Sequence, residues 1–121
     1  MLIVGLTGGI GRGKSTVAAA LALRTALLRP RSPVLLLSPS LRQSGELFRK
    51  VLELFNALGR PAPVAAESAL RLELATGSRV VSLPGDEKNI RGFSGVALLV
   101  IDEAARVEDA LYYSVRPMLA V

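Results

Sequence analysis

The sequence predicts an α/β fold with a mostly parallel sheet, because short apolar runs alternate with helical segments along the chain. The runs "LIVGL" (2–6), "VLLLS" (34–38) and "VALLVI" (96–101) have the continuous apolar character of buried parallel strands. Long segments with helical character follow the first and the second of these runs. We therefore expect a three-layer α/β/α arrangement, with helices flanking the sheet.

The two predicted helices have recognisable ends. The first runs from Ser15 to about Leu28, is rich in Ala and Leu, and ends at the prolines of "RPRSP". Ser40 is expected to cap the second helix, which ends at Gly59. The apolar residues of the second helix recur at spacings of three and four: Leu47, Val51, Leu54, Phe55 and Leu58.

The second half of the chain is expected to add a hairpin and a last strand. "RPAPVAAES" (60–68) is predicted to be a loop. "ALRLELATGSRVVSL" (69–83) alternates apolar and polar residues about a "TGS" turn, which predicts a β-hairpin. A polar loop, the strand at 96–101 and a short helix within 107–121 complete a single domain over residues 1–121.

Composition excludes several kinds of site. The 121 residues include no cysteine and no histidine, so neither disulfides nor zinc sites built on these side chains are available. A metal ion would have to be held by oxygen ligands, which favours Mg²⁺. No apolar run approaches the ~20 residues of a membrane-spanning helix, and we expect a cytoplasmic protein.

The net charge of +5 is distributed unevenly. Residues 1–45 hold six Lys and Arg and no acid, whereas residues 46–121 hold nine basic and ten acidic residues. This pattern fits an ordinary solvated surface, and it equally fits a face that meets the phosphates of a nucleotide or a nucleic acid.

The loop after the first strand carries the strongest motif. Gly8, Gly13, Lys14 and Ser15 fit the pattern G-x-x-x-x-G-K-[ST], between an apolar strand and an alanine-rich helix. This is a phosphate-binding loop, in which backbone N–H groups surround a phosphate, Lys14 bridges the outer phosphates of ATP, and the Ser15 hydroxyl reaches Mg²⁺. The predicted nucleotide-binding residues are Gly8, Gly9, Ile10, Gly11, Arg12, Gly13, Lys14, Ser15 and Thr16.

A second motif follows the strand at 96–101. Asp102 and Glu103 stand where a buried parallel strand ends, at the edge of the sheet where ligands bind. Asp102 is expected to hold Mg²⁺ through water, and Glu103 to orient and deprotonate a water that attacks ATP. Alternatively, the two acids cap the helix that follows. Arg12 and Arg91 are candidates to stabilise charge on the γ-phosphate.

Residues 1–18, "MLIVGLTGGIGRGKSTVA", resemble the start of a dephospho-coenzyme A kinase. That family usually has Ser where this chain has Arg12, and it carries an acid after the second strand that receives the substrate hydroxyl. Here the second strand runs into "SPSLRQSGE", with no acid before Glu46. The catalytic carboxylate of the kinase is therefore missing. Such a kinase stays an alternative, as does a non-catalytic module that binds nucleotide or nucleic acid.

From about residue 14 onward, the chain resembles the ATPase domain of a bacteriophage or prophage terminase large subunit. The similar segments are "GKSTVAAALAL", "VLLLSPSLRQSGELFRKV", "ALRLELATGSRVVSLPG", "NIRGFSGVALLVIDEAARV" and "LYYSVRPMLAV". The resemblance implies a P-loop NTPase, with Walker A and Walker B motifs, that hydrolyses ATP with Mg²⁺ to package viral DNA in the host cytoplasm. It further implies that Ser38, Arg42 and Gln43 lie near DNA or nucleotide.

The same resemblance implies partners. They are double-stranded DNA, the portal or procapsid and the small terminase subunit. A homo-oligomer is compatible with the resemblance. Terminases usually carry a nuclease domain behind the ATPase domain, which we expect to be absent here.

Two features depart from the terminase pattern. Terminases usually carry a finger arginine at the position of Ile10, and here Arg12 lies two residues away. Arg12 is interpreted as a partial replacement, or else the site is impaired. In addition, terminases insert a later strand between the Walker A and Walker B strands, and the sequence ends at Val121 before that strand. We therefore expect an incomplete sheet and a truncated domain with little packaging activity.

Overall fold

The computed structural model describes residues 2–5, 12–84 and 92–102, with the backbone alone for residues 12–15. This part of the chain forms two helices, α1 (Arg12–Leu28) and α2 (Leu41–Ala57). Its strands are β1 (Leu2–Gly5), β2 (Pro33–Ser38), β3 (Val64–Glu67), β4 (Arg71–Leu74), β5 (Arg79–Pro84) and β6 (Leu98–Ile101).

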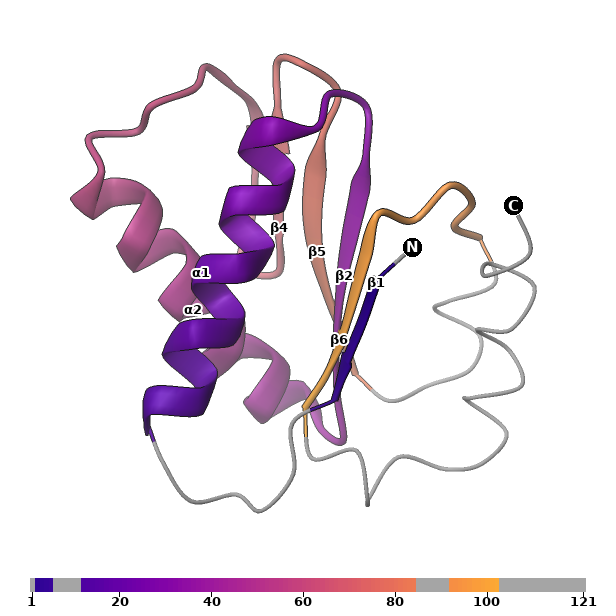
Figure 1. Cartoon of the computed structure of the whole chain (residues 1–121). Helices are drawn as coiled ribbons and strands as arrows, with labels where there is room; N and C mark the ends of the chain where they lie inside the picture. The colour runs from indigo at the N-terminus through magenta and orange to yellow at the C-terminus, as the bar shows by residue number, and fades with distance from the viewer. Residues whose placement is uncertain (1, 6–11, 85–91, 103–121) are drawn as a thin grey trace.

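One mixed sheet runs through the domain in the order β1-β6-β2-β5-β4-β3 (Figure 1). The first four of these strands are parallel to one another. β4 and β5 form the predicted hairpin and are antiparallel, as are β3 and β4. The α/β class predicted from the sequence is confirmed, and so are the strands β2 and β6, every residue of which is buried.

Both helices cover the same face of the sheet (Figure 1). They enclose the main core, to which α1 contributes mostly small side chains and α2 large ones. The core residues of the helices are Ala18, Ala19, Ala22, Leu23 and Ala26 of α1 and Leu47, Phe48, Val51 and Phe55 of α2. On the opposite face a smaller cluster gathers side chains of β2, β5 and β6. The helix predicted within 107–121, which would supply a further layer, lies outside the described residues.

Ser40 caps the start of α2 as the sequence predicts, whereas the C-cap is Leu58, one residue before the predicted Gly59. Ser40 has an extended backbone, and its Oγ accepts a hydrogen bond from the Gln43 N–H at 3.2 Å. After α2, Gly59 takes a φ of +77°, which glycine adopts without steric cost. Its N–H donates to the carbonyl oxygen of Asn56 at 2.9 Å.

None of the described helices is long and apolar enough to cross a membrane.

The prediction of a loop at 60–68 is wrong over part of its length. Val64 pairs with Leu74 and Glu67 with Leu72, so that β3 forms an edge strand with an irregularity after Val64. Its side chains are mostly exposed and show no alternation of apolar and polar residues. The strand forms because β4 offers a free edge to it, and that pairing leaves no local signal in the sequence.

The first strand also differs from expectation. β1 was predicted to be buried, yet it lies at the end of the sheet, where Leu2 is 55% and Ile3 is 41% exposed. In addition, β1 pairs directly with β6, from Leu2 opposite Leu98 to Gly5 opposite Ile101, so the expected gap between the two strands is not found among the described residues. Among the described residues, β1 and β3 form the two edges of the sheet, because the order of strands begins at β1 and ends at β3.

Candidate nucleotide-binding site

The candidate site lies where the parallel strands end. Ile101 is in register with Gly5 on one side and with Leu37 on the other, so β1, β6 and β2 end together. Helix α1 begins at the same end of the sheet (Figure 1). A helix N-terminus presents free N–H groups and a partial positive charge, both of which attract phosphate. Gly5, which precedes the phosphate-binding loop, and Ile101, which precedes Asp102, are thus brought to one edge.

Part of the predicted nucleotide site can be placed. Arg12, Gly13, Lys14 and Ser15 form the first turn of α1, where their backbone is described, and Thr16 follows with an exposed side chain. The other loop residues, Gly8, Gly9, Ile10 and Gly11, lie outside the described residues. Their contacts with nucleotide stay a prediction.

Asp102 follows β6 directly and is half-buried. Its N–H donates a hydrogen bond of 2.7 Å to the carbonyl oxygen of Leu37, which continues the pairing of β6 with β2 by one residue. The backbone of Asp102 is therefore fixed at the carboxyl edge of the sheet, beside the end of β2. Glu103 and Arg91, the other two candidates of this region, lie outside the described residues.

A group of buried serines lies beneath the first turns of α2. Ser82 Oγ donates to the carbonyl oxygen of Ser44 at 2.8 Å and so ties β5 to α2. Ser38, the last residue of β2, is fully buried, and its Oγ has no hydrogen-bond partner among the described residues; the same holds for Ser44 Oγ. An unpaired buried hydroxyl costs about 1–3 kcal/mol, so Ser38 Oγ is a group that a polar ligand at this edge would satisfy.

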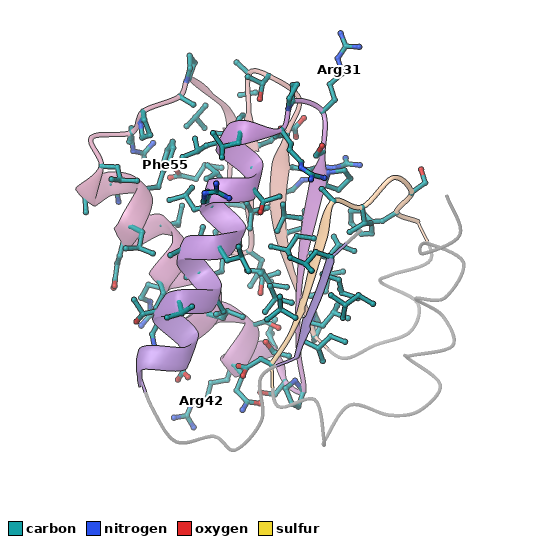
Figure 2. All side chains as sticks on the ribbon, viewed as in Figure 1. Arg31, Arg42 and Phe55 are labelled. Atoms are coloured by element: carbon teal, nitrogen blue, oxygen red, sulfur yellow. The ribbon has the colours of Figure 1, made fainter. Side chains whose placement is uncertain are left out.

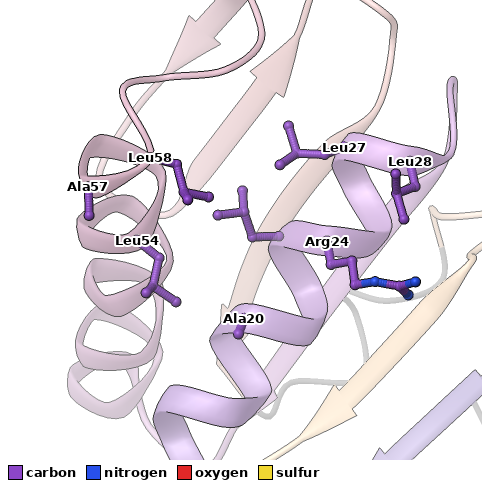
Figure 3. A pocket seen from close by; sticks show the side chains of 8 residues that line it. Ala20, Arg24, Leu27, Leu28, Leu54, Ala57 and Leu58 are labelled. Atoms are coloured by element: carbon purple, nitrogen blue, oxygen red, sulfur yellow. The ribbon is translucent and has the colours of Figure 1, made fainter.

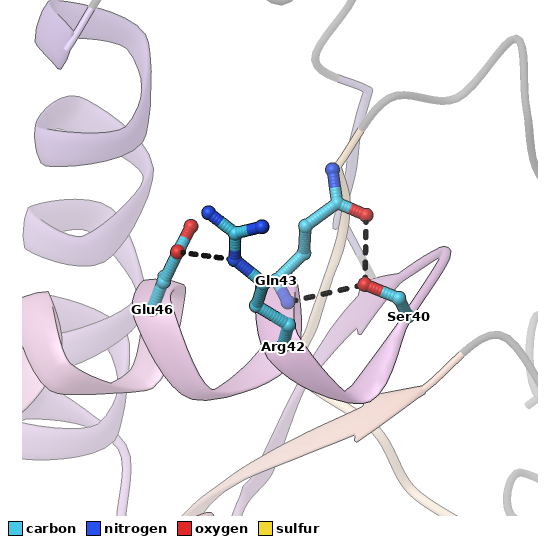
Figure 4. Close-up of polar contacts among 4 residues, drawn as sticks. All are labelled: Ser40, Arg42, Gln43 and Glu46. Carbon is cyan, nitrogen blue, oxygen red and sulfur yellow. Dashed lines mark hydrogen bonds and ion pairs between the residues drawn. The ribbon is translucent and has the colours of Figure 1, made fainter.

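The start of α2 carries the other two residues that the terminase resemblance singles out (Figure 4). Ser40 Oγ donates to Gln43 Oε1 at 3.1 Å, while Arg42 Nε lies 3.2 Å from Glu46 Oε1. The Arg42 side chain is 87% exposed, so this ion pair contributes little to stability. Arg42 projects from the end of the domain that carries the site, and Arg31 projects from the opposite end (Figure 2).

The oxygen-bearing side chains at this edge of the sheet are of the kind that holds Mg²⁺ together with a bound nucleotide. Among the described residues no group of three acids, histidines or cysteines is placed to hold a metal on its own. Mg²⁺ commonly keeps several waters and is bound through one or two carboxylates and the phosphates of a substrate. The Asp102 carboxylate and the Ser15 hydroxyl are of the required type, and they come from two segments that end at the same edge.

The contact between Ser44 and Ser82 was not predicted from the sequence. Ser38 was singled out through the terminase resemblance, but Ser44 and Ser82 were not. The local signals are weak: Ser82 lies within the apolar run "RVVSLP", and Ser44 lies on the buried side of α2. Neither signal indicates that the two residues contact each other.

Comparison with known proteins gives a family and a fold. A family model described as "RNA cytidine acetyltransferase NAT10/TcmA, helicase domain" matches residues 5–116. The ATPase domain of the large terminase of Thermus phage P74-26 is similar in structure, with a TM-score of 0.70 and 19% identity over 95% of this chain and 55% of that chain. A point mutant of the same domain gives a TM-score of 0.65 at 19% identity, over 96% of this chain and 55% of that one.

The chain thus spans about half the length of these phage structures. No curated protein matches it in sequence. At 19% identity the structural likeness shows the fold, and it confirms the terminase-type ATPase fold predicted from the sequence. The dephospho-coenzyme A kinase alternative receives no support from any of the comparisons.

Proposed function

The chain belongs to the family of the NAT10/TcmA helicase domain, and on this premise we propose that it binds ATP, hydrolyses it, and couples hydrolysis to a nucleic acid. The observation that carries the proposal is the meeting of β1 and β6 at one edge of the sheet. Gly5, which leads into the phosphate-binding loop, is paired with Ile101, which leads into Asp102. An ATPase of this class requires these two motifs side by side, since one holds the phosphates and the other the metal acid.

The roles of the residues follow from their chemistry. The backbone N–H groups of the loop and of the first turn of α1 bind the phosphates, and Lys14 neutralises the outer ones. Bound Mg²⁺ would neutralise further charge on the β- and γ-phosphates, with Ser15 and Asp102 as the residues that hold it.

Glu103, next in sequence to Asp102, accepts the proton of the attacking water. Charge that develops on the γ-phosphate is stabilised by Arg12 or Arg91. The Ser38 hydroxyl, buried and unpaired among the described residues, is available to a ligand oxygen at the same edge.

RNA is the nucleic acid that the family favours. The family is that of the helicase domain of an RNA cytidine acetyltransferase, and the first 45 residues of this chain carry six cations and no acid. Double-stranded DNA, handled as in viral DNA packaging, is the second candidate, because the structural neighbours are large-terminase ATPase domains. The portal or procapsid and the small terminase subunit would be partners under this second candidate alone.

We expect ATP turnover by the chain in the presence of Mg²⁺, and a several-fold stimulation by single-stranded RNA. The measurement is the rate of ADP formation, which reports both hydrolysis and phosphoryl transfer, with no addition, with single-stranded RNA, with double-stranded DNA and with dephospho-coenzyme A. Heparin serves as a control, because a chain of net charge +5 attracts any polyanion.

Arg12→Ala in the same assay tests the role of that residue. A rate equal to that of the parent chain excludes Arg12 as the finger arginine that stabilises the γ-phosphate.

Each of the other outcomes contradicts part of the proposal. Stimulation by double-stranded DNA alone selects the packaging candidate, and stimulation by dephospho-coenzyme A selects a kinase. Binding of ATP without turnover under all conditions leaves a non-catalytic module. Equal stimulation by heparin and RNA shows that charge alone is responsible.

A further inference from the structure

The outward side of α1 is apolar, which is unusual for a helix at the surface. Val17 is 68% and Leu28 63% exposed, and between them Ala20 is exposed as well. Arg24 is the one charged residue between Val17 and Leu28. By contrast, α2 exposes Arg42, Glu46, Arg49 and Glu53. A helix that is apolar on its outward side as well as its inward side is typical of one covered by a further layer.

The apolar side of α1 continues into a groove between α1 and α2 (Figure 3). The groove has a volume of about 470 Å³ and is lined by leucine and alanine side chains, with Arg24 as its only charged lining residue. Leu27 of α1 faces Leu54 and Leu58 of α2 across it, and Leu58 is 62% exposed. Water therefore contacts several large apolar side chains at this place, and covering them would favour a complex.

We propose that this groove, together with the outward side of α1, docks a helix of a partner protein that is apolar on one side and carries a carboxylate opposite Arg24. The shape favours a helix. The apolar stretch from Val17 to Leu28 extends for about 17 Å along α1, which corresponds to roughly three turns of a partner helix. Ala20 and Ala57 line the groove with small side chains, which lets a helix backbone approach closely.

Charge decides which partner fits. Helix α1 contains Arg12, Lys14 and Arg24 and no acid, and no ion pair of Arg24 is found among the described residues. A second copy of this chain, packed α1 to α1, would bring cations together with no carboxylate between them. A carboxylate on a partner helix supplies the missing charge. Figure 3 shows the Arg24 guanidinium on the side of α1 away from α2, so the carboxylate would lie at that rim of the groove.

The test uses two labelled helical peptides of about 18 residues, roughly 27 Å long. They share one apolar side of leucines and differ in one flanking position, which is Glu in the first peptide and Lys in the second. Fluorescence anisotropy gives their affinities for the complete chain. We expect the Glu peptide to bind the parent chain at least tenfold more tightly than the Lys peptide, and Arg24→Glu to invert this preference.

Two further variants separate the apolar contact from the charge. Val17→Asp and Leu28→Asp should weaken both peptides at least tenfold, and since both residues are about two-thirds exposed, the fold should persist. Arg49→Glu is the matched control, because this exposed cation of α2 is not among the groove residues, and it should change neither affinity.

Three results would overturn the proposal. The first is no binding of the Glu peptide at millimolar concentration, and the second is an unchanged preference in Arg24→Glu. The third is a dimer of the parent chain that Leu28→Asp dissociates, since the face would then pair with a second copy. None of these readouts uses ATP. The docking proposal can therefore fail while the proposed ATPase function holds, and the ATPase function can fail while the docking proposal holds.

Discussion

Glu103→Gln is expected to bind ATP as tightly as the parent chain and to lose turnover by about 10²- to 10⁴-fold, the contribution of a positioned general base. The substitution keeps the size of the side chain and its ability to hydrogen-bond, but an amide cannot accept the proton of the attacking water. Asp102, whose backbone is fixed beside the end of β2 through its N–H bond to Leu37, is unchanged, so the variant retains the proposed metal ligand. Phosphate release and ATP binding measured on the same sample separate the two steps.

The matched control for this variant is Glu108→Gln, which changes the acid five positions further along the sequence in the same manner. It should leave turnover within about twofold of the parent chain, a difference under 0.5 kcal/mol in the barrier. If Glu103→Gln hydrolyses ATP at the parental rate, Glu103 is not the base, and the two acids are better explained as a cap of the segment that follows.

Phe48→Ala should cost about 3–5 kcal/mol of the free energy of unfolding, because it removes a large side chain from a closed core. Phe48 is 0% exposed and packs in the cluster between α1, α2 and the sheet. Domains of this kind are stable by only about 5–15 kcal/mol, so the variant is expected to be marginally folded at room temperature. Urea denaturation followed by circular dichroism measures the change.

Leu41→Ala provides the comparison, since Leu41 begins the same helix and is 63% exposed. Its effect should stay within about 0.5 kcal/mol. Should Phe48→Ala not fold at all, Phe48→Leu gives a smaller loss that can still be measured in the same way. Equal stabilities of the Phe48 and Leu41 variants would mean that the core between the helices and the sheet is not formed as described.

The elements that sequence reasoning placed well are those with strong local signals. β2 and β6 are continuous apolar runs, and they are buried along their whole length. Ser40 caps α2 because its hydroxyl accepts from an N–H three residues away, a contact that the sequence itself specifies. The hairpin of β4 and β5 follows in the same way from alternation on either side of Gly77, whose φ of +91° suits the turn.

The parts that were missed depend on distant segments. β3 exists because β4 offers it an edge, and the position of β1 beside β6 depends on a pairing between residues almost a hundred positions apart. In the site, the loop motif and Asp102 are each a local pattern in the sequence; the structure places Asp102 at the end of β6, and the roles of both stay predictions. The hydrogen bond between Ser82 and Ser44 joins residues 38 positions apart, and no local pattern predicts such a contact.

Binding of ATP by the parent chain and by Lys14→Ala tests the central claim most directly, because every role proposed for the nucleotide site requires phosphate at the first turn of α1. Isothermal titration with Mg²⁺ present gives both affinities. We expect saturable binding of one ATP by the parent chain and an affinity at least tenfold lower in Lys14→Ala, which corresponds to about 1.4 kcal/mol. Equal affinities in the two proteins, or no binding by the parent chain, would contradict the assignment of this edge of the sheet as a nucleotide site.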